Sequence, residues 1–202
     1  MMTNIFSQDV SIILLAGGKS KRMGRDKCLI KLNGKTLLEH NISKAEKITR
    51  NILIIANQSK YGQFKYPLHK DIFTNKGPIG GIHTGLFHST TNTNIVIGCD
   101  MPNLSLNFLQ YMLKSHNVNF QATIPIHLEK IQPLAGVYEK TFMDIHESQI
   151  KAGKNKMKDL LRVSDIKYID ISNDLEFYSP YLFDNVNTVE DLQKYQQSNS
   201  WR

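Results

Sequence analysis

The residues that could do chemistry gather after a short apolar run near the start of the chain. The segment SIILLAGGKSKRMGRDKCLIKLNGK, residues 11–35, passes from this run into Gly17 and Gly18 and then into a stretch rich in cations. Seven Lys or Arg lie in residues 19–35, where Asp26 is the only acid. Glycines leave backbone N–H groups open to a ligand, and crowded cations are best neutralised by an anion. The segment therefore predicts a loop that binds a nucleotide phosphate.

Neither of two familiar phosphate-binding loops fits this segment. A P-loop has four residues between its glycines and then Lys followed by Ser or Thr, whereas five residues separate Gly18 from Gly24, and Arg25 follows. The dinucleotide fingerprint GxGxxG is not present here either. A solvated basic loop is the alternative. The glycines and the apolar run before them argue against it.

A carboxylate follows another apolar run, in NIVIGCDMP, residues 94–102. Asp100 stands where the carboxyl end of a strand is expected, and Pro102 prevents the strand from continuing. Mg²⁺ prefers one or two carboxylates together with phosphate oxygens and water. Beside a phosphate loop, Asp100 therefore predicts a Mg²⁺ site, although an Asp after a strand can also cap a turn or a helix.

Two further polar stretches could contact a nucleotide. In KDIFTNKGPIGGI, residues 70–82, Pro78 suits the first turn of a helix, whose free N–H groups can face an anion or a base edge. Gly80 and Gly81 either admit a ligand or allow close helix packing. Asn57, at the end of the second expected strand, either reads a base edge or only ends that strand.

Apolar runs that alternate with helical patterns must position these residues. Strands are expected at 10–15, 51–56 and 94–98, and helices at 36–48, 79–89 and 105–115. This alternation predicts an α/β fold with a mainly parallel sheet, whose loops at the carboxyl ends of the strands form the site. In the second half we expect a hairpin around 127–130, a mostly helical basic stretch at 140–162, a strand at 166–171, and a final helix capped by Thr188 and Asp191.

Size and composition fit one medium domain. The chain has 202 residues, 41% of them hydrophobic and 21% charged, and no apolar run approaches membrane-spanning length. The first ten residues show no signal-peptide pattern, so we expect a cytoplasmic protein without a membrane anchor. Of its 25 Lys and Arg, twelve lie in residues 19–35 and 151–162, a distribution that fits a compact polyanion as well as nucleic acid. The two cysteines, Cys28 and Cys99, are expected to be reduced thiols, and the seven scattered His to be structural.

The stretch LLAGGKSKRMGRDK, residues 14–27, resembles the signature LAGGxSxRMGxDK of the molybdenum cofactor guanylyltransferase (MobA) family. Further pieces similar to that family follow in the same order: GPIGGI at 77–82, GCDMP at 98–102, QPLAGVY at 132–138 and NVNTVEDL at 185–192. The resemblance implies a three-layer, Rossmann-like (GT-A type) nucleotidyltransferase fold with a small antiparallel portion. It implies a single domain over 1–202, with a nucleotide-binding part at about 8–104 and a second-substrate part at about 105–197.

The resemblance also implies an activity: transfer of GMP from GTP to the molybdenum-bearing molybdopterin, with release of pyrophosphate. It gives catalytic roles to Arg22, Lys27 and Asp100, with Mg²⁺ at Asp100; Lys19 and Arg25 rank lower. The nucleotide-binding residues that it implies are Leu15, Ala16, Gly17, Gly18, Lys27, Asp71 and Asp100. It places Asn185 and Asn187 near the pterin substrate, and the basic segment 151–162 either holds that second anion or is a solvated surface.

Three other functions remain open from the residues. A related nucleotidyltransferase could act with CTP on molybdopterin or on a sugar or alcohol phosphate, although Gly18 and the Asp26–Lys27 pair argue against it. The interpretation as a nucleic-acid-binding protein rests on the net charge of +7 alone. A catalytically silent GTP-binding regulator is the third. The resemblance implies no nucleic-acid or membrane partner, and it leaves room for other cofactor-biosynthesis proteins and for molybdoenzymes that accept the product.

Overall fold

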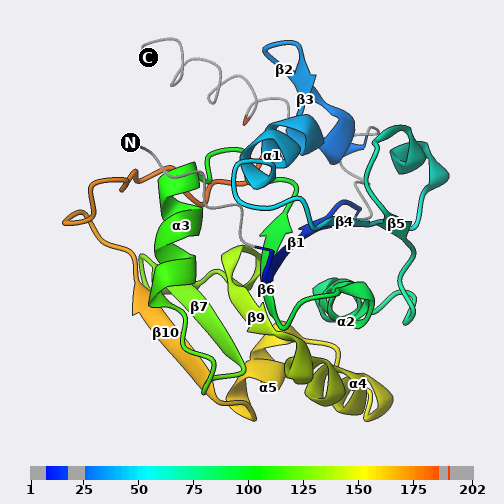
Figure 1. Ribbon diagram of the computed structural model, residues 1–202. Helices are drawn as coiled ribbons and strands as arrows, with labels where there is room; N and C mark the ends of the chain where they lie inside the picture. Colours follow the sequence, from blue (N-terminus) through cyan, green and yellow to red (C-terminus); the bar gives the residue numbers. More distant parts are fainter. Residues whose placement is uncertain (1–7, 18–25, 187–190, 192–202) are drawn as a thin grey trace.

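A computed structural model describes residues 8–17, 26–186 and 191 (Figure 1). Its main sheet has eight strands in the order β10-β7-β9-β6-β1-β4-β5, with β8 paired to β7. The strands are β1 Val10–Leu15, β4 Ile52–Ile55, β5 Leu68–His69, β6 Thr93–Gly98, β7 Ala122–His127, β8 Lys130–Ile131, β9 Val137–Glu139 and β10 Ile166–Asp170. A separate hairpin joins β2 Lys31–Leu32 to β3 Lys35–Thr36.

Helices cover both faces of the sheet and produce the expected three layers. The helices are α1 Leu37–Ala45, α2 Pro78–His88, α3 Leu106–Ser115, α4 Met143–Lys151 and α5 Met157–Arg162. As Figure 1 shows, α1 and α3 lie on one face, and α2, α4 and α5 lie on the other. The central strand β1 is buried on both sides, with Ile12 and Leu14 in the core under α1 and α3 and Ile13 in the core under α2. This two-sided burial explains its continuous apolar sequence.

The sheet brings the ends of its parallel strands to one edge. β1 pairs in parallel with β4 and β6, and β4 pairs in parallel with β5. The residues that follow β1, β4, β5 and β6 therefore meet at what we call the carboxyl edge. Helix α2 lies tight against β1 because Gly85 has no side chain, and a Cβ there would come within 2.4 Å of Ile13 Cγ2.

Most of the elements expected from the sequence are confirmed. The hairpin around 127–130 forms between β7 and β8, and the basic stretch is helical in α4 and α5. The short strand β9 runs antiparallel between β6 and β7 and supplies most of the antiparallel portion. The final helix lies outside the described residues, apart from Asp191. In the part of the chain that the structure describes, no helix is long and apolar enough to cross a membrane.

Candidate functional site at the carboxyl edge

The end of β1 is held between its two neighbours. The Cys99 N–H donates to the Leu15 carbonyl (3.1 Å), and the Ala16 N–H donates to the Ile55 carbonyl (2.9 Å). Hydrogen bonding thus continues past β1 into the first residues of the loop. Gly17 then adopts a φ of +148°, a conformation that side chains disfavour. The backbone conformation at position 17 therefore requires a glycine, which is the residue predicted to open the loop.

Asn57 and Asp71 form a pair beside this turn. Asn57 Nδ2 donates to Asp71 Oδ2 (2.7 Å), and the Asp71 N–H donates to Asn57 Oδ1 (3.0 Å). A Cβ built on Gly81 of α2 would lie 3.7 Å from Asp71 Oδ1 and 3.3 Å from Leu15 Cδ2. The pair therefore lies between the end of β1 and the start of α2. Sequence reasoning left the role of Asn57 open, and its amide fixes the orientation of the Asp71 carboxylate.

The start of α2 has the conformation expected of a helix that begins at Pro78. Gly77 precedes it with a φ of +63°, and Pro78 occupies the first helical position, where its missing N–H costs nothing. A Cβ at Gly80 would lie 2.8 Å from the Phe73 carbonyl oxygen. The backbone is closely packed at Gly80 and Gly81, and the admission of a ligand there stays a prediction.

Asp100 follows β6 in a half-buried position. Burial raises the pKa of its carboxyl above the usual value, and the positive charge of Lys27 counteracts part of this rise. Two residues that are 73 positions apart therefore interact electrostatically at the carboxyl edge. The Val186 N–H donates to the Asp100 carbonyl (2.9 Å) and brings the exposed Asn185 beside the same turn.

Asp26 anchors the segment that carries Lys27. Its carboxylate accepts hydrogen bonds from the Cys28 N–H (3.1 Å) and the Tyr61 hydroxyl (2.6 Å), and it forms an ion pair with Lys60 (2.7 Å). Burial, then the hydrogen bond and charge of Asp26, raises the pKa of Tyr61, so this hydroxyl stays a neutral donor. Asp26 therefore fixes the backbone beside Lys27 and is itself neutralised by Lys60.

The prediction that Cys28 and Cys99 are reduced thiols is wrong in this structure. The two residues form a disulfide, with Cα atoms 5.7 Å apart and a sequence separation of 71. Both side chains are buried. The bond joins the residue after Lys27 to the residue before Asp100. Nothing in the local sequence signals this pairing, because the contact exists only after β6 and the loop after β1 come together.

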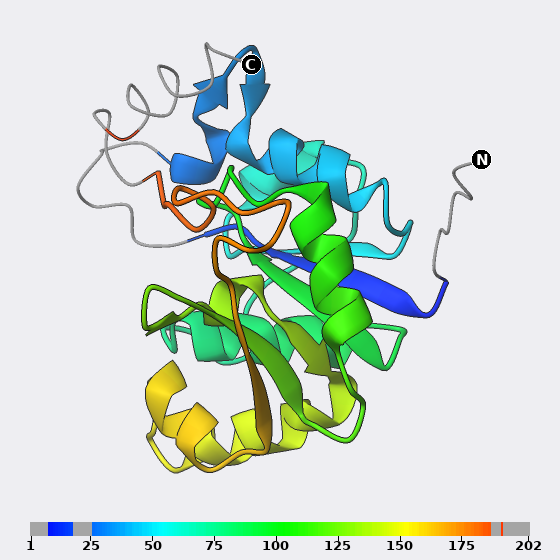
Figure 2. The same cartoon turned by 90° about the vertical axis from the view of Figure 1, so that its left-hand side faces the viewer.

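The structure brings most of the predicted site residues to one edge. Leu15, Ala16, Gly17, Lys27, Asp71, Asp100 and Asn185 all lie along the connected contacts described above. Gly18, Arg22 and Asn187, with Lys19 and Arg25, lie outside the described residues, and their roles stay predictions. The segment after β10 (orange in Figure 2) lies near the start of α3, where Phe177 and Phe183 pack on Phe108.

The basic segment lies on the surface. Its cations Lys151, Lys154, Lys156, Lys158 and Arg162 are all exposed. Lys151 forms an i,i+4 ion pair with Glu147 (2.5 Å). These positions fit a solvated surface, and contact with a second anionic substrate stays a prediction.

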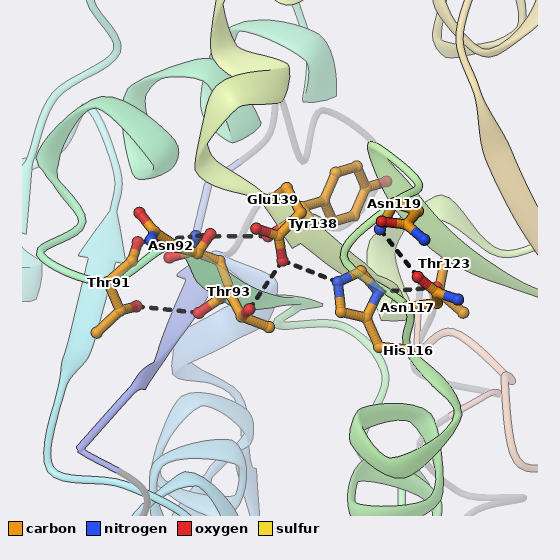
Figure 3. A network of polar contacts seen from close by, with 10 residues as sticks. Thr91, Asn92, Thr93, His116, Asn117, Asn119, Thr123, Tyr138 and Glu139 are labelled. Carbon is orange, nitrogen blue, oxygen red and sulfur yellow. Dashed lines mark hydrogen bonds and ion pairs between the residues drawn. The ribbon is translucent and has the colours of Figure 1, made fainter.

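A different polar cluster occupies the opposite edge of the sheet, which we call the amino edge (Figure 3). His116 at the end of α3 contacts Thr123 Oγ1 through Nδ1 and Glu139 Oε1 through Nε2, each at 2.8 Å. Thr93 Oγ1 also donates to Glu139 Oε1 (2.8 Å). Although a hydroxyl, an imidazole and a carboxylate in line look like a catalytic triad, Thr123 is fully buried, so no substrate can reach it. The cluster agrees with the structural role expected of the histidines.

The residues at the carboxyl edge fit a Mg²⁺ ion. Asp100 offers a half-buried carboxylate whose pKa is raised by burial, so a nearby cation would stabilise its charged form. Among the described residues there is no group of three or more His, Cys, Asp or Glu that could hold a metal by itself. Mg²⁺ commonly takes only one or two carboxylates and completes its shell with substrate phosphates and water. A single carboxylate therefore suits an ion that arrives with a nucleotide.

Comparison with known proteins places this arrangement in a family. Residues 12–168 match the model of the MobA-like NTP transferase domain. The chain belongs to this family. A protein named probable molybdenum cofactor guanylyltransferase, from Flavobacterium johnsoniae, is 32% identical over 92% of this chain and 95% of its own length. The molybdenum cofactor guanylyltransferase of Vibrio vulnificus is 33% identical over 94% of this chain and 96% of its own. This MobA-like protein is therefore a nucleotidyltransferase.

Solved structures agree with the fold of this MobA-like chain. Molybdopterin-guanine dinucleotide biosynthesis protein A from Archaeoglobus fulgidus superposes with a TM-score of 0.83 at 24% identity, covering 95% of this chain and 100% of that one. A 4-diphosphocytidyl-2C-methyl-D-erythritol synthase from Anaerococcus prevotii gives a TM-score of 0.70 at 13% identity, with 95% and 96% covered. Both confirm the mixed, mostly parallel sheet of a nucleotidyltransferase.

Proposed function

We propose that this protein transfers GMP from GTP to molybdenum-bearing molybdopterin and releases pyrophosphate. The observation that carries the proposal is the Cys28–Cys99 bond, which joins the residues next to Lys27 and Asp100 at the carboxyl edge, in a chain about one third identical to proteins named for this reaction. A phosphate oxygen of molybdopterin forms a bond to the α-phosphorus of GTP. The bond from that phosphorus to the bridging oxygen breaks, and pyrophosphate leaves with the electron pair.

The chain's own residues position the nucleotide and balance its charge. Because the attacking phosphate is already an anion near neutral pH, no general base is required. Backbone groups of Ala16 and Gly17 lie beside the triphosphate, and Lys27 and Arg22 neutralise the charge that develops on the departing pyrophosphate. The carboxylate of Asp71, oriented by Asn57, contacts the nucleoside. We assign Asn185 and Asn187 to the pterin side.

Asp100 would hold the Mg²⁺ that enters with GTP. When bound, this ion neutralises phosphate charge and helps align the triphosphate. Lys27 would offset the same negative charge, so the two residues act on one group. We expect the half at about 8–104 to bind GTP and the half at about 105–197 to bind molybdopterin, in one cytoplasmic domain. Other cofactor-biosynthesis proteins and molybdoenzymes that accept the product are the expected protein partners.

The competing proposal is a relative that uses CTP, and one assay separates the two. Purified protein is incubated with molybdopterin, molybdate, Mg²⁺ and each nucleoside triphosphate in turn, and pyrophosphate and the dinucleotide product are quantified. We expect a guanine dinucleotide from GTP and little product from CTP. Equal use of GTP and CTP would contradict the guanylyl assignment, and GTP binding without pyrophosphate release would identify a silent GTP-binding protein.

A further inference from the structure

Helix α1 makes two hydrogen bonds to the backbone of the turn that carries Asp100. Asn41 Nδ2 donates to the carbonyl of Cys99 (3.3 Å), and Lys44 Nζ donates to the carbonyl of Pro102 (2.5 Å). Each bond joins residues 58 positions apart in the sequence. One helix thus holds the turn on both sides of Asp100.

Both side chains are unusual for the places they occupy. Asn41 is 1% exposed and belongs to the otherwise apolar face of α1, between Leu38 and Ile42. Lys44 is half-buried, one helical turn further on. Burying an amide or an ammonium group is costly unless it is hydrogen-bonded. The carbonyls of Cys99 and Pro102 accept these bonds, so contact with the turn offsets the cost of burying the two polar side chains.

Further backbone contacts support the turn, in addition to the Cys28–Cys99 bond and the bond from the Cys99 N–H to the Leu15 carbonyl. The Met101 N–H donates to the Gly98 carbonyl (3.3 Å), and the Val186 N–H donates to the Asp100 carbonyl (2.9 Å). The carbonyls of Cys99, Asp100 and Pro102 therefore all accept hydrogen bonds from other parts of the chain. The backbone is held, and with it the direction of the Cα–Cβ bond that carries the Asp100 carboxylate.

We propose that Asn41 and Lys44 are positioning residues, which set the Asp100 carboxylate for the metal ion through the Cys99 and Pro102 carbonyls. The inference rests on the proposed function, because it takes Asp100 as the metal ligand. Neither residue touches substrate. Supporting groups around a metal ligand typically affect metal affinity or activity by about 10- to 100-fold.

The test uses Mn²⁺ as a spectroscopic probe, so it does not depend on transfer to molybdopterin. Mn²⁺ affinity is measured by electron paramagnetic resonance with a non-hydrolysable GTP analogue present, for wild type, Lys44→Met, Asn41→Leu and Asp100→Asn. We expect Lys44→Met to weaken Mn²⁺ binding about 10-fold. Asn41→Leu should act in the same direction. Asp100→Asn should weaken it most, and Lys44→Arg, which keeps a cationic donor, should recover part of the loss.

Lys47→Met is the matched control, because Lys47 lies just beyond the same helix but is exposed. It should leave Mn²⁺ affinity within about twofold of wild type, and turnover of the folded Lys44→Met protein should fall with its metal affinity. Unchanged affinity in folded Lys44→Met would overturn the inference. If that variant does not fold, unchanged affinity in Asn41→Leu would do so.

The proposed function and the positioning role fail in different ways. Wild type that binds Mn²⁺ with the nucleotide but forms no guanine dinucleotide would refute the proposed function alone. Wild type that binds no Mn²⁺ with the GTP analogue would overturn the positioning role together with the metal role of Asp100.

Discussion

The two edges of the central sheet use polar residues in opposite ways. At the amino edge, His116 contacts both Thr123 and Glu139 at 2.8 Å, and the three side chains are shielded from solvent (Figure 3). At the carboxyl edge, Lys27 and Asp100 affect each other electrostatically, and burial raises the pKa of the carboxylate. The polar groups of the amino edge are hydrogen-bonded within the protein, while the carboxyl edge brings a half-buried carboxylate and a lysine to the ends of parallel strands.

The contrast indicates where a catalytic site can lie in such a fold. A carboxylate and an imidazole in line do not identify a catalytic site by themselves, because a substrate cannot reach a buried hydroxyl. Charged groups whose pKa is perturbed, at the ends of parallel strands, are better candidates. Variants at the carboxyl edge should therefore change turnover, and variants elsewhere should change stability.

The largest effect is expected from Lys27→Ala. Loss of one charge that acts on the departing pyrophosphate should lower turnover about 100-fold or more. Lys31→Ala is the control, because Lys31 is a nearby exposed cation in β2. Pyrophosphate release at saturating GTP measures both variants. Near-normal release by Lys27→Ala would remove the residue from the catalytic machinery.

Reduction of the Cys28–Cys99 bond should come next in size. A disulfide that closes a loop of this length typically contributes about 2–4 kcal/mol to the free energy of unfolding. Denaturant unfolding with and without a reductant measures the loss, and Cys28→Ser should be insensitive to reductant. Two alkylatable thiols in the protein isolated without reductant would contradict the bond.

The free energy of unfolding should depend on pH through His146, which lies away from the carboxyl edge. Burial lowers the pKa of His146 to about 4, whereas the unfolded chain protonates near the ordinary value of 6.5. Between pH 6.5 and pH 4, His146 is protonated in the unfolded state but not in the folded state. The free energy of unfolding should therefore fall by up to about 3 kcal/mol as the pH drops from 6.5 to 4. His146→Leu should flatten this dependence in denaturant unfolding. An equally steep loss in that variant would assign the dependence to other groups.

The smallest effect is expected from Thr123→Val at the amino edge. The change leaves the ring of His116 without its Nδ1 partner, which should cost about 1–2 kcal/mol of unfolding free energy. Turnover per folded molecule should stay within about twofold of wild type, since a stability change alone leaves the carboxyl edge intact. A larger loss of turnover without unfolding would show that the two edges are coupled.

Local sequence patterns predict those parts of the molecule that depend on near neighbours. The continuous apolar run of β1 indicates a doubly buried strand, and Gly17 and Pro78 predict the turns that begin the site. The three-residue strand β9 has no such signal, because its place between β6 and β7 depends on distant pairing.

The same limit applies within the site. Asn57 looks like an ordinary residue after a strand, and Asp71 is implied only by the family resemblance. Their partnership appears only when β4 and β5 lie side by side. Lys44 reads as one more surface cation of α1 until the turn after β6 lies next to it. The candidate residues named from the sequence lie within short motifs, and those that only the structure suggests make contacts across the fold.

The most direct test of the contrast between the edges compares three proteins in one assay. Wild type, Asp100→Asn and Thr123→Val are supplied with GTP, Mg²⁺ and molybdenum-bearing molybdopterin, and the guanine dinucleotide formed per folded molecule is quantified. We predict equal yields per unit time from wild type and Thr123→Val, and a rate at least about 100-fold lower from Asp100→Asn. A near-normal rate from Asp100→Asn would contradict the assignment of catalysis to the carboxyl edge.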